Sequence, residues 1–178
     1  MFTKLRLIFF EFERKFFPTT RPMFNEVKGK DLVGVEVGVN KGLNAYRLLK
    51  AMDIKMLYLI DPYPIEFTDS HLTYDNGDER YEYAQNLLKE FNNKKFYRCT
   101  VNNITLPMLD FAYIDGDHSY EGTMTDLKAI YPKVKKGGIL GGDNFDVHWI
   151  GVPLAVIDFA REHNLEIKGT GNQWWFNV

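Results

Sequence analysis

Two short motifs hold the side chains of this sequence that are best suited to chemistry. Asp115 lies in the motif Ile-Asp-Gly-Asp-His, and Asp143 and Asn144 end the motif Gly-Gly-Asp-Asn, each directly after an apolar run typical of a buried strand. A helix predicted from Tyr120 to about Tyr131 separates them, so the two strands should be parallel neighbours. The three side chains should therefore converge at one sheet edge, where their oxygen atoms suit Mg²⁺ or a similar cation.

A second candidate site follows the first predicted strand, Leu32–Val37. The turn after it contains Gly38, Asn40 and Gly42 and leads into a helix, so a ligand could approach the backbone and the helix N-terminus. A dinucleotide-binding turn would carry three glycines, and this one has two. Glu36 would repel a pyrophosphate but suits a ligand with ammonium and sulfonium charges, such as S-adenosylmethionine. Ordinary turn glycines and a structural salt bridge of Glu36 are the alternatives.

Asp61 ends the second predicted strand, where its carboxylate could accept hydrogen bonds from both hydroxyls of a ribose. NAD-binding folds use an acidic residue in the same way, so Asp61 does not distinguish the two cofactors. A plain turn residue before Pro62 is the alternative. The connection over 62–78 has no clean period and is predicted to be a lid over the pocket, with a disordered excursion as the alternative.

The order of these elements predicts an α/β fold with a doubly wound, seven-stranded, mostly parallel sheet. Five parallel strands are followed by an antiparallel C-terminal hairpin, because a Gly/Asn-rich separator at 169–172 is a hairpin signal. The predicted strands are 32–37, 56–60, 95–99, 109–114, 138–140, 165–168 and 173–177, and the predicted helices are 43–52, 79–91, 120–131 and 153–163.

Composition limits the classes of partner and compartment. At 178 residues the chain is expected to form one main domain, and its net charge of −2 argues against nucleic-acid binding by bulk positive charge. A single cysteine, Cys99, allows no intrachain disulfide and fits a reducing, cytoplasmic location. No apolar stretch approaches the roughly 20 residues that a transmembrane span needs.

The segment 1–30 differs from the rest and is predicted to be a separate N-terminal amphipathic helical segment. Apolar residues and charges of both signs alternate through residue 17, and Glu11 and Glu13 argue against a signal peptide. Packing against its own domain, or against a twin subunit in a homodimer, is the favoured interpretation. Binding to a membrane surface is the alternative.

Together, the motifs resemble class I S-adenosylmethionine-dependent methyltransferases, and most closely the small-molecule O-methyltransferases grouped with macrocin O-methyltransferase and cephalosporin-hydroxylase-like proteins. The resemblance lies in Glu36–Gly42, Asp61–Tyr63, Ile114–Tyr120 and Gly138–Asn144, and it covers roughly 31–178. It implies a methyltransferase domain over 31–178 with a Rossmann-like fold. Asn40 stands where many members have a glycine, and Asn tolerates positive φ better than most residues.

The resemblance also implies roles for individual residues. The cofactor-binding residues implied by it or by the turn chemistry are Glu36, Gly38, Asn40, Gly42, Asp61, Tyr63, Asp115, Gly116 and His118. In cation-dependent relatives the positions of Asp115, Asp143 and Asn144 hold the metal. His118 matches the position of a base that removes the hydroxyl proton, and a contact to the cofactor or a structural role is its alternative.

The expected function is methyl transfer from S-adenosylmethionine to a hydroxyl of a small molecule or sugar, assisted by Mg²⁺, with Asp115 and His118 as catalytic residues. A metal would lower the pKa of the acceptor hydroxyl and so favour its attack on the sulfonium methyl. Two alternatives remain: a metal-independent methyltransferase with His118 as base, and a Rossmann-type nucleotide-binding protein without methyl transfer.

Overall fold

The computed structural model describes residues 21–64, 68–69, 72–73 and 76–178. The helix predicted within 1–17 lies outside the described residues. Within these ranges, no helix is both long and apolar enough to cross a bilayer.

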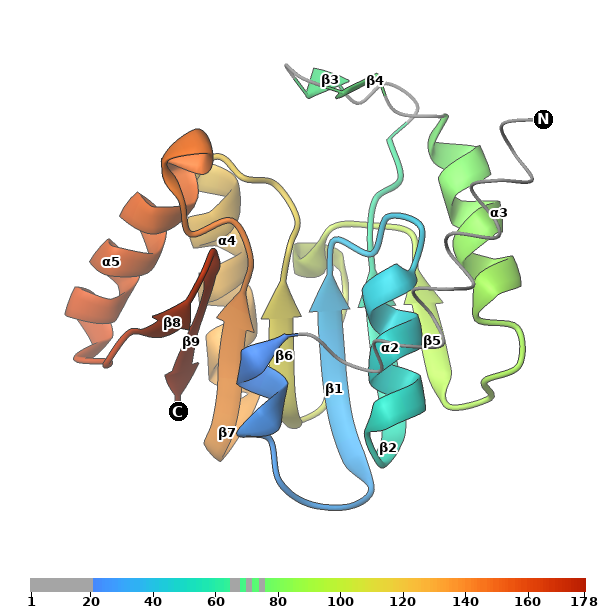
Figure 1. Ribbon diagram of the computed structural model, residues 1–178, viewed down its shortest axis with the longest axis horizontal. Coiled ribbons are helices and arrows are strands. Elements are labelled where there is room, and N and C mark those ends of the chain that lie inside the picture. The colour runs from blue at the N-terminus through green and yellow to red at the C-terminus, as the bar shows by residue number, and fades with distance from the viewer. Residues whose placement is uncertain (1–20, 65–67, 70–71, 74–75) are drawn as a thin grey trace.

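A seven-stranded sheet forms the centre of the molecule, with the strand order β5-β2-β1-β6-β7-β9-β8 (Figure 1). The first five strands in this order are parallel, β9 is antiparallel to β7, and β8 is antiparallel to β9. This topology confirms the predicted fold class. The strands of this sheet are β1 Leu32–Val37, β2 Ile54–Ile60, β5 Lys94–Tyr97, β6 Leu109–Ile114, β7 Val134–Gly142, β8 Lys168–Thr170 and β9 Gln173–Asn177.

Helices cover both faces of this sheet. In Figure 1, α2 and the short 3₁₀ helix η1 lie in front of the strands, while α4 lies behind them. Helix α4 begins at Tyr120 as predicted, and Ser119 caps it, because its Oγ accepts a hydrogen bond of 3.0 Å from the backbone N of Gly122. The helices are η1 Pro22–Asn25, α2 Leu43–Ala51, α3 Gly77–Leu87, η2 Val101–Asn103, α4 Tyr120–Ile130, η3 Tyr131–Lys133, η4 Val147–Trp149 and α5 Gly151–His163.

The C-terminal hairpin is tighter than the sequence pattern predicts. The strand expected at 165–168 begins only at Lys168, and Thr170 pairs with Gln173 across a two-residue turn. Gly171 takes a φ of 61° in this turn, which glycine adopts without steric cost. The Gly/Asn-rich segment therefore contributes to strand β8 as well as to the turn.

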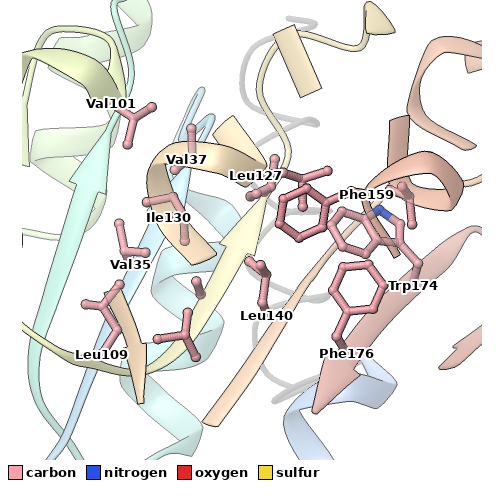
Figure 2. Packing of buried hydrophobic residues seen from close by; sticks show 14 of the residues in the cluster. Val35, Val37, Val101, Leu109, Leu127, Ile130, Leu140, Phe159, Trp174 and Phe176 are labelled. Carbon is pink, nitrogen blue, oxygen red and sulfur yellow. The ribbon is translucent and has the colours of Figure 1, made fainter. Parts of the chain in front are cut away.

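The core on the α4 and α5 face of the sheet joins strand residues to helix residues (Figure 2). Val35 and Leu140 from the sheet pack with Leu127 of α4 and Phe159 of α5, and all four side chains are fully buried. Fully burying such a side chain contributes about 1.5–3 kcal/mol. This packing fixes the carboxyl ends of β1, β6 and β7 relative to one another.

The opposite face carries a second core, to which the N-terminal part of the described chain contributes. Met23 and Phe24 of η1 are buried there, and the ring of Phe24 meets that of Phe111 edge-on at 5.8 Å. Residues 22–25, grouped with the N-terminal segment in the sequence interpretation, thus pack against the sheet. The division of the chain at residue 30 stays a prediction.

The long connection after β2 contains a short antiparallel pair, β3 Thr68–Asp69 and β4 Leu72–Thr73, where no strand was predicted. In Figure 1 this pair lies beyond the carboxyl ends of the parallel strands. Residues 65–67, 70–71 and 74–75 lie outside the described part of the chain, so the lid role of this connection stays a prediction.

Candidate active site

The carboxyl edge of the sheet holds a buried carboxylate at the end of β1. Glu36 is 1% exposed, and its Oε1 accepts a hydrogen bond of 3.0 Å from the side-chain amide of Asn44 on α2. Its Oε2 is buried without a hydrogen-bond partner among the described residues. Burial raises the pKa of Glu36 to about 8, against the lowering effect of the Asn44 hydrogen bond. An unsatisfied buried oxygen of this kind is costly unless a ligand pairs with it.

The turn after Glu36 has the backbone geometry that its residues predict. Gly38 has a φ of 86°, and a Cβ atom there would overlap the backbone oxygen of Asp115, so only glycine fits. Asn40 has a φ of 49°, consistent with its tolerance of this region. Gly42 has a φ of 77°, and a Cβ there would lie 3.3 Å from Ala84 of α3. The absence of a side chain at Gly42 therefore allows α2 and α3 to pack closely.

Asp61 is held in place by two backbone groups. Its Oδ2 accepts from the backbone N of Asn40 at 2.8 Å, and its Oδ1 accepts from the backbone N of Tyr63 at 2.7 Å. These bonds fix the carboxylate beside the turn after β1. The side chain of Tyr63 is 1% exposed and packs against Tyr81 at a ring distance of 5.0 Å. Tyr63 therefore contributes to this site through its backbone rather than its ring.

The ends of β6 and β7 bring together the three side chains that the two motifs singled out. The backbone N of Asp143 bonds to the oxygen of Ile114, which places the two strand ends side by side. Asn144 donates from its backbone to Oδ1 of Asp143 at 2.9 Å. With the amide oriented as its neighbours require, the Asn144 side chain also donates to Oδ1 of Asp115 at 3.0 Å. Its oxygen then accepts from Nε1 of Trp149 at 3.1 Å.

His118 lies against the same cluster. Its Nε2 is 3.4 Å from Oδ1 of Asp115 and 3.1 Å from the side-chain nitrogen of Asn144. Because Asn144 donates to it, Nε2 carries the lone pair and is the atom of His118 that can take a proton. The ring meets that of Trp149 edge-on at 4.5 Å, which fixes its orientation. Trp149 was not singled out from the sequence.

Arg21 lies between the carboxylates, and sequence reasoning missed it. It forms an ion pair with Asp143, and its Nη2 is 3.9 Å from Oδ2 of Asp115. Its Nε donates to Oδ1 of Asn44 at 3.1 Å, and its guanidinium lies 4.9 Å from the ring centre of Tyr113. A lone arginine in a segment separated from the domain gives no pattern that would mark it as a site residue.

These contacts bear on the predicted metal site. One oxygen of Asp143 accepts from Arg21 and the other from Asn144, while the amide oxygen of Asn144 faces Trp149. In this orientation the amide oxygen of Asn144 faces Trp149 rather than the two carboxylates. Across the described ranges, no group of three or more His, Cys, Asp or Glu side chains is arranged to hold a metal ion. In this arrangement Arg21 supplies the positive charge next to Asp143, and the metal role of the three side chains stays a prediction.

A further titratable group lies behind the turn after β6. A Cβ at Gly116 would lie 3.0 Å from Oδ2 of Asp126, so the missing side chain leaves room for this carboxylate. Burial, together with the neighbouring Asp117 carboxylate, raises the pKa of Asp126 to about 7. Gly116 therefore has a packing role in this structure, on the side of the turn that faces α4.

Comparison with known proteins identifies the class. Residues 35–145 match the methyltransferase domain family, and the chain belongs to this family. The matched region contains Glu36, Asp61, Asp115 and Asp143, which lie on the four strand ends described above.

One relative with a known sequence shares only moderate identity with the chain. The chain is 28% identical over 133 residues to Uncharacterized protein R132 of Acanthamoeba polyphaga mimivirus, a match over 70% of this chain and 57% of the viral protein. The chain thus spans little more than half the length of this relative.

Two solved methyltransferase structures have the same fold. CalS11, a TDP-rhamnose 3′-O-methyltransferase of calicheamicin biosynthesis, aligns with a TM-score of 0.64 at 16% identity, over 87% of this chain and 75% of its own. The N-methyltransferase NodS of Bradyrhizobium japonicum WM9, in complex with S-adenosyl-L-homocysteine, aligns with a TM-score of 0.58 at 15% identity, over 83% and 77%. At this identity the likeness concerns the fold alone.

Proposed function

We propose that the protein transfers a methyl group from S-adenosylmethionine to a hydroxyl of a small molecule or sugar. The observation that carries the proposal is the buried, unpaired Oε2 of Glu36 beside the Gly38 turn, at the carboxyl edge of a methyltransferase-family sheet. A buried carboxylate oxygen without a donor calls for a cationic partner. The ammonium group of S-adenosylmethionine is such a partner, whereas a pyrophosphate would be repelled.

On the cofactor side, two carboxylates have separate tasks. Glu36 would hold the ammonium end, and Asp61, fixed by the backbones of Asn40 and Tyr63, would accept hydrogen bonds from the ribose hydroxyls. When bound, S-adenosylmethionine supplies an electrophilic methyl group on its sulfonium. Gly38 keeps the turn free of side chain, so that the ligand can approach the backbone.

On the acceptor side, His118 is the proposed base. Its Nε2 carries the lone pair, and Oδ1 of Asp115 at 3.4 Å would stabilise the imidazolium formed when the proton is taken. Trp149 and Asn144 hold the ring in this orientation. A positioned base contributes about 10² to 10⁴ in rate.

We propose the metal-independent alternative, in which His118 is the base and no divalent cation takes part. Both oxygens of Asp143, Oδ1 of Asp115 and the amide oxygen of Asn144 accept hydrogen bonds from Arg21, Asn144 or Trp149, and the proposed reaction uses no metal. The sugar acceptor of CalS11 supports a hydroxyl substrate, and the N-methyltransferase activity of NodS is the competing chemistry on the same fold. A cytoplasmic location and a homodimer remain predictions.

Calorimetry with S-adenosyl-L-homocysteine and with NAD⁺ tests the cofactor. We expect micromolar binding of the former and no binding of NAD⁺. Transfer of label from methyl-labelled S-adenosylmethionine to an acceptor panel of sugar nucleotides, catechols and amines then tests the reaction. Binding of NAD⁺ in place of S-adenosyl-L-homocysteine, or labelling of amines alone, would overturn the proposal.

A further inference from the structure

We propose that Arg21 is the resident cation of the acceptor site and does the work that the sequence assigns to a divalent ion. This inference rests on the proposed function, because it names the group that holds the acceptor oxygen. It assigns a role in the site to a residue from the start of the described chain, outside the segment that matches the methyltransferase domain family.

The contacts of Arg21 place its charge at the centre of the site. The guanidinium pairs with Asp143 at the end of β7 and lies 3.9 Å from Oδ2 of Asp115 at the end of β6. Its side chain is 18% exposed, and the ring of Tyr113 lies 4.9 Å from it. Arginine stays protonated at any physiological pH, so the positive charge is permanent.

The donors of Arg21 are divided between the two halves of the site. Nη1 of Arg21 donates to Asp143, and its Nε donates to Asn44. The side-chain amide of Asn44 in turn donates to Glu36. A chain of hydrogen bonds thus runs from the acceptor carboxylate Asp143 to the cofactor carboxylate Glu36. Arg21 and Asn44 link the two binding regions through side chains alone.

The gap between Nη2 and Oδ2 of Asp115 has the size for an acceptor hydroxyl. At 3.9 Å the two atoms are too far apart for a direct hydrogen bond. A hydroxyl oxygen about 2.8 Å from each could accept from Nη2 and direct its proton toward the Asp115–His118 pair. A cation next to that oxygen stabilises the negative charge that forms there.

The reaction step balances without a metal. As the bond between the acceptor oxygen and the methyl carbon forms, the carbon–sulfur bond breaks and its electron pair stays on sulfur. The hydroxyl proton passes first to Oδ2 of Asp115, and Nε2 of His118, 3.4 Å from Oδ1 of the same carboxylate, is its final acceptor. Arg21 keeps its proton throughout and acts by charge and hydrogen bonding.

Binding of Mn²⁺ tests whether Arg21 occupies the place of a divalent cation, and it needs no acceptor. The wild-type protein and the control Arg161→Met should show the same weak Mn²⁺ binding by electron paramagnetic resonance, because Arg161 is 77% exposed on α5. Arg21→Met leaves Asp143 and Asp115 without their cation. It should bind Mn²⁺ at least about tenfold more tightly, since a positive charge is removed from beside two carboxylates.

Further variants separate this result from misfolding. Arg21→Gln, which removes the charge but keeps hydrogen-bond donors, should show the same gain even if the methionine variant is unstable. Adding Asp143→Asn to either variant should abolish the gain. The proposal is overturned if wild type binds Mn²⁺ as tightly as the Arg21 variants, or if neither variant gains affinity.

Binding of S-adenosyl-L-homocysteine keeps the two proposals apart. If the proposed function is wrong, the wild-type protein should not bind S-adenosyl-L-homocysteine. The Mn²⁺ comparison among Arg21 variants would still decide whether Arg21 is the resident cation.

Discussion

Asn44 donates a hydrogen bond of 3.0 Å to one oxygen of Glu36, while the other oxygen of that buried carboxylate has no partner among the described residues. Without a ligand, only one of the two oxygens of Glu36 thus accepts a hydrogen bond. Because burial raises the pKa of Glu36 to about 8, this group is mostly protonated at pH 7 before a ligand binds. A cationic ligand beside Glu36 would lower its pKa and favour the ionised carboxylate.

Binding of S-adenosyl-L-homocysteine at pH 7 should release about one proton, because its ammonium group favours ionised Glu36. Calorimetry in two buffers of different ionisation enthalpy measures this release. Glu36→Gln should abolish it and weaken binding by about 1–3 kcal/mol, the cost of losing a charged acceptor. Glu162→Gln on the exposed side of α5 is the control. Unchanged proton release in Glu36→Gln would contradict the assignment.

Asp61→Asn should weaken binding of both S-adenosyl-L-homocysteine and adenosine by about 1–3 kcal/mol, because the ribose is common to both ligands. Glu36→Gln should affect adenosine little, since adenosine has no ammonium group. Titration of the two variants with the two ligands makes this comparison. Equal losses for adenosine in both variants would place Glu36 and Asp61 at the same part of the ligand.

His118→Gln should lower kcat for methyl transfer by about 10²-fold or more, with KM for S-adenosylmethionine nearly unchanged, because the proton acceptor is lost. Steady-state assays with labelled cofactor and an acceptor found in the panel measure both constants. His148→Gln, an exposed neighbour on η4, is the matched control. A large rise in KM for the cofactor with kcat retained would instead make His118 a cofactor contact.

Methyl transfer should continue at its full rate in excess EDTA, because Arg21 supplies the positive charge at Asp143 and Asp115. The assay compares initial rates of wild type with and without EDTA, and then after adding Mg²⁺ to each sample. Loss of activity in EDTA that Mg²⁺ restores would return the mechanism to the metal-assisted alternative.

Asp126→Asn should stabilise the protein more at pH 8 than at pH 5. The pKa of Asp126 is raised from 3.8 to about 7 on folding, so the folded state binds the proton more tightly than the unfolded state. Stability from this group is therefore full below about pH 4 and is lost as pH rises through about 7. Urea denaturation of both proteins measures the free energy of unfolding that Asp126→Asn gains over wild type. This gain should be about 1–2 kcal/mol larger at pH 8 than at pH 5, a value that allows for the partial exposure of Asp126. Equal stabilisation at both values would show that Asp126 does not titrate in this range.

The order of apolar runs and turns in the sequence determined the sheet and its carboxyl edge. Strand residues alternate toward two cores, and parallel βαβ units place the strand ends Glu36, Asp61, Asp115 and Asp143 along one side. Local turn chemistry also followed from residue type, as the positive φ of Gly38 and Asn40 shows. These features depend on neighbours in the chain, so one sequence suffices to predict them.

Only the tertiary structure decided what lies between those strand ends. Arg21 and Asp143 are 122 positions apart, and their ion pair exists because Met23 and Phe24 pack on the sheet and bring Arg21 to its edge. The orientation of Asn144 depends likewise on Trp149, and that of Glu36 on Asn44. Side-chain contacts between distant segments have no periodic signature in the sequence, because they depend on how whole elements pack. The carboxylates at the strand ends were therefore readable from the chain, whereas the ion pair of Arg21 with Asp143 and the contact of Asn144 with Trp149 were not.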